Sequence, residues 1–230
     1  MAQQHSPRSR IRVVIVDDHV LFAESLELAL SVEGYDVRRP ELPDDPGSPG
    51  SLLSAVTRAK PAVVLLDLDL GRFGDGVRLI GPLAQAGINV VVVTSSLDRA
   101  RWGDALRLGA RTVLAKSRPL NDILATVRRL YQGLPVMDRE EREDLLRHWQ
   151  RQRAEHHAVR DRIDRLTARE AQVLGHLMRG QTVHEIAATS FVSEATVRTQ
   201  VKAILAKLEV SSQIAAVGLA HQIGWHPPVA

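Results

Sequence analysis

Residues 63 to 71 read VVLLDLDLG, and this stretch decides the fold because an apolar run passes directly into carboxylates at Asp67 and Asp69. Consecutive apolar residues of this kind are typical of a strand buried on both faces, as in a parallel sheet. Besides this strand at 62–66, similar valine-rich segments occur at 11–16, 88–93 and 111–115, with a weaker candidate for an edge strand at 35–39. Segments with helical apolar spacing separate them. The alternation predicts a doubly wound α/β domain with a five-stranded parallel sheet over residues 11–133.

The composition is that of an ordinary globular protein with room for two domains: 230 residues, 44% of them hydrophobic. No apolar run approaches the roughly 20 residues of a membrane span, and no secretory signal is recognisable, so we expect a cytoplasmic protein without a membrane partner. Residues 1–10 are expected to be a disordered tail. The absence of cysteine excludes disulfides and thiolate metal sites. A net charge of +3 permits contact with nucleic acid without establishing it.

Residues 134–165 are expected to link the two domains. From 138 onwards this segment is densely charged and has no proline or glycine, which predicts a long solvated helix. Its apolar residues, among them Leu145, Trp149, Val159 and Ile163, fall near a seven-residue frame. Two interpretations stay open: a weak coiled coil that pairs two chains, or an amphipathic linker helix.

Residues 166–230 are predicted to form a small all-α domain of four helices. Thr167 with Glu170, and Thr182 with Glu185, have the spacing of capping boxes that begin helices. Ser193 is expected to begin the third helix, and Ser211 or Ser212 the fourth.

Polar side chains follow four of the predicted strands. Asp17 and Asp18 follow the first, and the other three strands are followed by Asp67, Thr94 and Lys116. In a doubly wound sheet, ligands bind beyond the carboxyl ends of the strands, so these side chains are expected to meet. Taken singly, an acidic residue in such a place is more often a turn former or a helix cap. The prediction of a site depends on the whole set.

Three carboxylates held together repel one another, and a divalent cation that prefers oxygen ligands relieves this. Mg²⁺ takes one or two carboxylates together with water and phosphate oxygens. With a phosphoryl group brought in, Asp67 is the candidate nucleophile, Lys116 would neutralise the incoming charge and Thr94 would donate its hydroxyl. Asp69 is a loop residue that offers only its backbone carbonyl as a ligand.

The segments IVDDH, LLDLD, VVTSS and LAKS, in this order, resemble the receiver domain of bacterial two-component response regulators. The resemblance implies a flavodoxin-like fold and phosphorylation of Asp67 by a histidine kinase. It also implies Mg²⁺ held by Asp18, Asp67 and the carbonyl of Asp69, with Asp17 assisting through water. Two departures stand out: Gly71 occupies the place of a usual proline in a longer loop, and Val113 stands where an aromatic switch residue is common.

Residues 166–223 resemble the LuxR-type, NarL-like helix-turn-helix domain, which implies a regulator of transcription rather than an enzyme. The second helix of such a unit lies in the major groove of double-stranded DNA. Arg198 can bond guanine through two hydrogen bonds, and Thr199 or Lys202 offers further base contacts. The candidates for phosphate contacts are Thr182, Thr196 and Lys207.

The small domain carries little excess charge, with five basic residues (Arg169, Arg179, Arg198, Lys202, Lys207) against four acidic ones (Glu170, Glu185, Glu194, Glu209). One copy should therefore bind DNA weakly, and we expect a homodimer on an inverted repeat, with RNA polymerase as a further possible partner.

Two alternatives remain. One is a transcription factor whose receiver is controlled by a ligand or a partner protein instead of phosphate. The other is a phosphatase of the haloacid-dehalogenase type, which also uses an aspartyl nucleophile. Such phosphatases place further acidic residues after the lysine, and the segment after Lys116 offers only Asp122.

Overall fold

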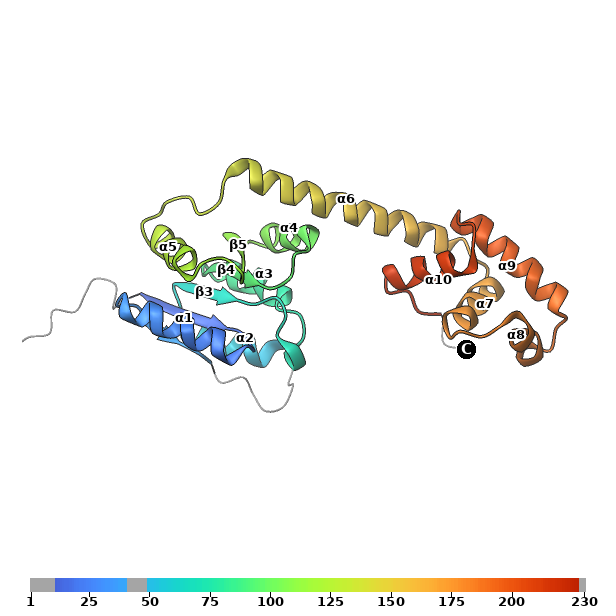
Figure 1. Ribbon diagram of the computed structural model, residues 1–230, viewed down its shortest axis with the longest axis horizontal. Helices are drawn as coiled ribbons and strands as arrows, with labels where there is room; N and C mark the ends of the chain where they lie inside the picture. The colour runs from blue at the N-terminus through green and yellow to red at the C-terminus, as the bar shows by residue number, and fades with distance from the viewer. Residues whose placement is uncertain (1–10, 41–48, 228–230) are drawn as a thin grey trace, which may run out of the picture. The chain divides into compact units, whose positions relative to one another are not determined.

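The computed structural model describes residues 11–40 and 49–227 (Figure 1). The tail predicted at 1–10 and most of the loop predicted at 40–50 lie outside this range. The chain divides into two compact units, one ending at Gln150 and the other beginning at Arg151.

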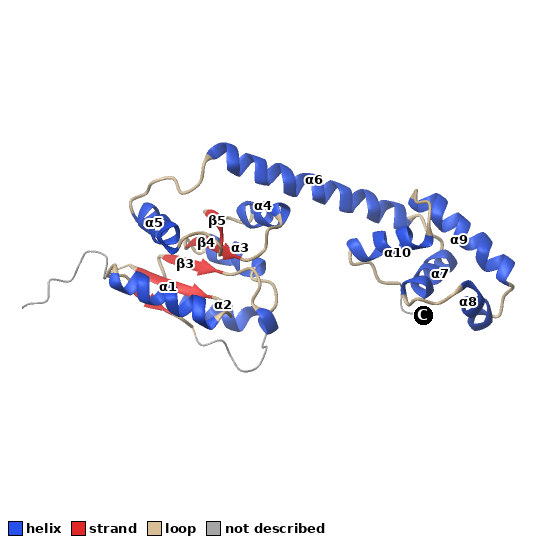
Figure 2. Cartoon of the chain, viewed as in Figure 1, coloured by secondary structure: helices blue, strands red, loops and turns tan. Residues whose placement is uncertain are grey.

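Five parallel strands form one sheet in the order β2-β1-β3-β4-β5. Figure 2 shows its strands in red with helices around them. The bounds of the strands are β1 Arg12–Val16, β2 Asp36–Arg38, β3 Val63–Leu66, β4 Asn89–Thr94 and β5 Thr112–Ala115. The predicted five-stranded parallel sheet is confirmed, and the weak candidate is indeed an edge strand. All four residues of β3 are buried, which explains its unbroken apolar run.

Helices cover both faces of the sheet. Their bounds are α1 Val20–Val32, α2 Pro49–Arg58, α3 Val77–Gln85, α4 Arg99–Arg107 and α5 Leu120–Tyr131. Helices α1 and α5 pack on one face, where Leu26 and Ile123 are fully buried. Helices α2, α3 and α4 pack on the other, with Val56, Ile80 and Leu106 in its core. Alternate side chains of each inner strand point to opposite faces of the sheet and so pack into the two cores in turn.

The register of the strands brings the predicted site together. Val16 of β1 lies beside Leu66 of β3, and Thr94 of β4 lies beside Ala115 of β5. The residues that follow these strands therefore begin at the same edge of the sheet.

A 26-residue helix, α6 (Arg139–Asp164), continues across the boundary between the units. Leu145 is fully buried in the core of the first unit, whereas Val159 and Ile163 are buried in the core of the second. Because the chain's own cores bury these apolar residues, the structure favours the amphipathic linker over the coiled coil.

The first half of α6 packs closely against α4. Gly103 makes this possible, because a Cβ atom there would collide with the backbone carbonyl of Leu145. At the two ends of the contact, Arg99 donates a hydrogen bond to Asp144 (2.6 Å) and the Arg107 guanidinium lies 4.8 Å from the centre of the Trp149 ring. The start of the linker helix is therefore part of the first unit.

The second unit contains four further helices: α7 Ala168–Met178, α8 Val183–Ser190, α9 Glu194–Leu208 and α10 Gln213–Gln222. Both predicted capping boxes are present, Ser193 caps α9, and Ser212 rather than Ser211 caps α10. In the described part of the chain, no single helix is long and apolar enough to cross a membrane, and only α9 and α10 taken together, with a bend of 53°, pass such a test of length and composition.

Glu170 ties α7 to α9. Its carboxylate accepts hydrogen bonds from the Thr167 backbone N–H (2.7 Å) and from Lys207 Nζ (2.6 Å). Burial alone would raise the pKa of Glu170, but these partners outweigh burial, and the pKa is lowered from its ordinary value of 4.5. The ionised carboxylate therefore stabilises the fold.

We expect Gly103→Ala to destabilise the first unit. Alanine in a helix interior normally adds up to about 1 kcal/mol over glycine, but here the added Cβ collides with α6. Thermal unfolding should show a lowered midpoint, and hydrogen exchange should be faster at the start of α6. Gly218→Ala in α10 is the matched control, because its Cβ would meet no atom within 4 Å and should raise stability. Equal behaviour of the two variants would contradict the close packing.

We also expect Glu170→Gln to lower the free energy of unfolding by about 1 kcal/mol or more at neutral pH, since it removes the charge of a buried cap. A carboxylate with a lowered folded pKa stabilises above its unfolded pKa, so the difference from the parent should shrink as pH falls below 4.5. Urea unfolding followed by circular dichroism at several pH values measures this. Glu155→Gln, on the exposed side of α6, serves as the control. A difference that does not change with pH would count against this role of the charge.

Candidate functional site

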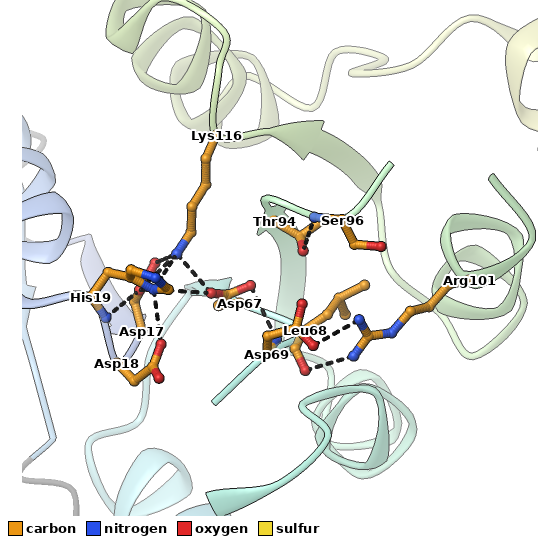
Figure 3. Close-up of polar contacts among 10 residues, drawn as sticks. All are labelled: Asp17, Asp18, His19, Asp67, Leu68, Asp69, Thr94, Ser96, Arg101 and Lys116. Carbon is orange, nitrogen blue, oxygen red and sulfur yellow. Dashed lines mark hydrogen bonds and ion pairs between the residues drawn. The ribbon is translucent and has the colours of Figure 1, made fainter. Parts of the chain in front are cut away.

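Three carboxylates and an imidazole gather at the carboxyl edge of the sheet (Figure 3). Oxygens of Asp17, Asp18 and Asp67 and a ring nitrogen of His19 all lie within 4.8 Å of one another. Lys116 Nζ donates hydrogen bonds to Asp17 (2.8 Å) and to Asp67 (2.7 Å). The structure therefore brings together the carboxylates and the lysine that the sequence predicts at this edge.

Burial and ion pairing shift the pKa values of Asp17 and Lys116 in this cluster. Burial raises the pKa of Asp17, the nearby Asp67 charge adds to this, and Lys116 offsets only part of it. Burial would lower the pKa of Lys116, but its hydrogen bonds to Asp17 and Asp67 outweigh burial and raise it. One ammonium group is thus shared between two carboxylates, and Asp18 adds a third.

The cluster fits a hard divalent cation. Among the described residues no donor forms a hydrogen bond with the buried Oδ1 of Asp18; His19 Nδ1 lies 2.9 Å away, but not in hydrogen-bonding geometry. A buried carboxylate oxygen without a donor is costly, and a bound cation would satisfy it. Carboxylate oxygens are also the ligands that Mg²⁺ prefers. The donor set is therefore consistent with a Mg²⁺ site.

Thr94 ends β4 beside the cluster, as Figure 3 shows, and is fully buried. Its hydroxyl oxygen accepts a hydrogen bond from the Ser96 backbone N–H (3.2 Å). Within the described residues no acceptor takes the hydroxyl hydrogen, so the hydroxyl can still donate one hydrogen bond.

The loop after β3 is held to α4 by a single arginine. Arg101 donates hydrogen bonds to the Asp69 carboxylate (2.8 Å), the Leu68 carbonyl (3.0 Å) and the Asp75 carboxylate (3.0 Å). The Asp69 side chain is therefore engaged by Arg101, which leaves the backbone carbonyl as its candidate ligand, as the sequence suggested. In the same loop Gly71 has φ +53°, and a Cβ there would come within 2.6 Å of Asp18 Oδ2. Glycine at this departure from the family pattern therefore suits the positive φ, and it also leaves room for the Asp18 carboxylate.

Two residues of this site were missed in the sequence. His19 directly follows the acidic pair, and its position beyond the first strand was a usable signal. Arg101 is 26 to 33 residues from its partners, and no local pattern connects them. Val113, at the usual position of the aromatic switch, is simply buried among apolar residues.

The second unit presents α9 as the candidate DNA-reading helix. Arg198 is 69% exposed, and its guanidinium donates a hydrogen bond to Glu194 (3.2 Å), one turn earlier. Glu194 also lies 2.9 Å from His184 Nδ1, and these partners, His184 before Arg198, lower the pKa of its carboxyl. Lys202 is exposed and has no ionic partner among the described residues. The charges best placed to meet DNA are therefore those of Arg198 and Lys202.

The other predicted contacts have structural roles of their own. Thr182 caps α8, the Thr196 hydroxyl lies 2.8 Å from that of Ser193, and the Thr199 hydroxyl donates to the Ala195 carbonyl (3.0 Å). Lys207 is bound to Glu170, so part of its charge is already neutralised.

Two family models match the chain. Residues 13–128, half of its length, match the response regulator receiver domain. Residues 164–220 match the bacterial regulatory proteins of the luxR family. Both models describe regulators rather than phosphatases.

Curated relatives span nearly the whole chain. The response regulator protein VraR of Staphylococcus epidermidis is 31% identical over 217 residues, covering 92% of this chain and 97% of the relative. An uncharacterised transcriptional regulatory protein of Bacillus subtilis, YhcZ, is 29% identical over 205 residues, covering 88% and 92% respectively.

A solved structure of the response regulator RcsB from Salmonella typhimurium covers 92% of this chain and all of its own, with 21% identity and a TM-score of 0.50. At this identity the likeness concerns the fold alone. Together with the two family models and the VraR relative, the geometry shows that the chain belongs to the response regulators that join a receiver domain to a LuxR-type DNA-binding domain and regulate transcription.

Proposed function

We propose that Asp67 accepts a phosphoryl group from a histidine kinase. The observation that carries this proposal is the position of Lys116 Nζ, 2.8 Å from Asp17 and 2.7 Å from Asp67. A carboxylate oxygen of Asp67 attacks phosphorus, and the P–N bond of the phosphohistidine breaks, leaving its electron pair on the imidazole nitrogen. Lys116 and the Thr94 hydroxyl then hold the phosphoryl oxygens.

Mg²⁺ is assigned to Asp18, Asp67 and the backbone carbonyl of Asp69, with Asp17 assisting through water. When bound, it neutralises charge on the carboxylates and on the phosphoryl oxygens. The buried Asp18 oxygen without a hydrogen-bond donor supports this assignment.

Access to Asp67 involves His19. Asp67 is 1% exposed, and His19 Nδ1 lies 3.8 Å from its Oδ2. The imidazole is 60% exposed, so it can turn outward at little cost in packing. We infer that this movement opens the carboxylate to the donor.

Helix α4 is the element through which phosphorylation would reach the linker. Arg101 binds the loop after Asp67, and Trp102 Nε1 donates a hydrogen bond to the Ser96 carbonyl (2.9 Å), just beyond Thr94. The next residue, Gly103, packs against α6. A shift of either loop on phosphorylation would therefore move α4 and change its contact with α6.

For DNA binding we assign base contacts to Arg198, Thr199 and Lys202, and phosphate contacts to Thr182, Thr196 and Lys207. The exposure of Arg198 and Lys202 on α9 supports the first set most directly. Since one domain has an excess of a single positive charge, we place two copies on an inverted repeat as a homodimer. We place this DNA binding in the cytoplasm and propose RNA polymerase as a further possible partner.

A second candidate function is regulation without phosphate, by a ligand or partner protein. Two observations favour it: the usual aromatic switch is replaced by the buried Val113, and Arg101 holds the loop of the site through three hydrogen bonds.

Asp67→Asn is expected to abolish acyl-phosphate labelling by acetyl phosphate, because the amide is a poor nucleophile. Phos-tag electrophoresis measures the labelled fraction, and sedimentation measures any dimer that depends on it. The control is Asp69→Asn, whose side chain is bound to Arg101 and should not be needed for labelling. Normal labelling of Asp67→Asn would refute the assignment, and labelling without any change in dimerisation or DNA affinity would favour the second candidate.

Arg198→Ala is expected to weaken binding to a DNA site selected from a random pool by about 1 to 3 kcal/mol, if Arg198 reads a base. Fluorescence anisotropy at fixed salt on selected and scrambled duplexes gives both affinities. Arg169→Ala, in α7, is the charge-matched control. An equal loss on the scrambled duplex would mean that Arg198 contacts a phosphate.

A further inference from the structure

A cavity lies at the edge of the sheet opposite the acidic cluster. It has a volume of about 520 Å³ and is lined by the α4–β5 turn, the end of α5, the segment 133–137 and Arg142 of α6. Asn89 and Arg111, which also line it, stand at the amino ends of β4 and β5. The acidic cluster stands at the carboxyl ends, so the two sites are separated by the length of the strands.

The charge of this cavity is positive. Its lining contains two guanidinium groups, Arg111 and Arg142, and no carboxylate. Arg111 Nε donates to the side-chain oxygen of Asn89 (2.8 Å), and Arg142 donates to the backbone carbonyls of Leu106 (3.1 Å) and Ala110 (3.5 Å). All three partners are neutral, and among the described residues neither guanidinium meets an acidic side chain. Two uncompensated cations around one hollow favour an anion there.

The remaining wall is largely apolar. Leu130, Leu134, Val136 and Met137 line it, and its volume falls within the usual range of small-molecule sites, about 300 to 1,000 Å³. The wall is also held in place, because Arg129 Nε donates a hydrogen bond to the Pro135 carbonyl (2.8 Å). A hollow with a cationic side and an apolar side matches a ligand with an anionic head and an apolar body.

We propose that this cavity binds a small monocarboxylate with a short apolar body, whose carboxylate is held by Arg111 and Arg142. Arg142 belongs to α6 and also bonds the last turn of α4. A carboxylate that binds Arg142 therefore changes the packing of α4 against α6. The same packing would transmit a structural change from the acidic cluster to the linker helix. The site is a second regulatory input, independent of whether Asp67 is phosphorylated.

Isothermal titration of the full chain with sodium hexanoate tests the proposal. We expect saturable binding at one site, and no saturable binding of hexanol or hexylamine, which match the apolar body but lack the negative head. Inorganic phosphate should bind more weakly than hexanoate, because it cannot use the apolar wall. No saturable binding of hexanoate overturns the proposal, and so does equally tight binding of phosphate, which would reduce the cavity to a simple anion site.

Two variants locate the binding. Arg111→Gln removes one cation from an exposed position, and Leu134→Trp fills the hollow without removing a hydrogen bond; each should weaken hexanoate binding about tenfold or more. Arg78→Gln, on the exposed side of α3, is the matched control and should bind as the parent does. Circular dichroism verifies that each variant folds. If Leu134→Trp unfolds, the hexanoate affinity of Arg111→Gln tests the proposal by itself, because Arg111 is exposed. Unchanged affinity in Arg111→Gln overturns the proposal. Asp67→Asn should bind hexanoate normally, which separates this result from the phosphorylation assay.

Discussion

The sharing of one ammonium group between Asp17 and Asp67 is the interaction on which the receiver depends. Two carboxylates 4 Å apart repel by about 4 kcal/mol at an effective dielectric constant near 20, and Asp18 adds a third charge to the same edge. The pKa of Asp17 stays raised chiefly because the carboxyl is buried, with the Asp67 charge adding to this, so Lys116 offsets the cost of the carboxylate charge only in part. The site therefore still favours additional positive charge, which a divalent cation would supply.

Helix α4 connects this site to the rest of the chain through consecutive residues. Arg101 faces the loop after β3, Trp102 faces the loop after β4, and Gly103 lies against α6. A helix turns about 100° at each residue, so neighbouring positions contact different elements. At the other end of α4, the Leu106 carbonyl accepts a hydrogen bond from Arg142, beside the cavity at the amino ends of the strands. A single short helix can thus respond both to the acidic cluster and to a ligand at the opposite edge of the sheet.

In the DNA-binding unit, the candidate DNA contacts differ in how far they already stabilise the fold. Thr167, Glu170 and Lys207 are engaged in capping and in tying α7 to α9. Arg198 and Lys202 are on the exposed side of α9, and among the described residues the ionic partner of Arg198 is Glu194, whose side chain is 43% exposed. Phosphate oxygens and base edges can replace such a partner, whereas displacing Lys207 from Glu170 would leave a buried carboxylate unpaired.

Patterns in the amino-acid sequence were enough to predict the five-stranded parallel sheet, the capped helices of the second unit and the gathering of Asp17, Asp18, Asp67, Thr94 and Lys116 at one edge. They were enough because hydrophobic period and capping act over a few residues, and because parallel strands end at a common edge. Four features became visible only in three dimensions. Arg101 holds the loop after Asp67, Gly103 allows α6 to pack closely on α4, Lys207 is paired with Glu170, and Leu145, Val159 and Ile163 of α6 are buried in the chain's own cores. These contacts depend on how separate elements pack against one another, which no local pattern in the sequence specifies.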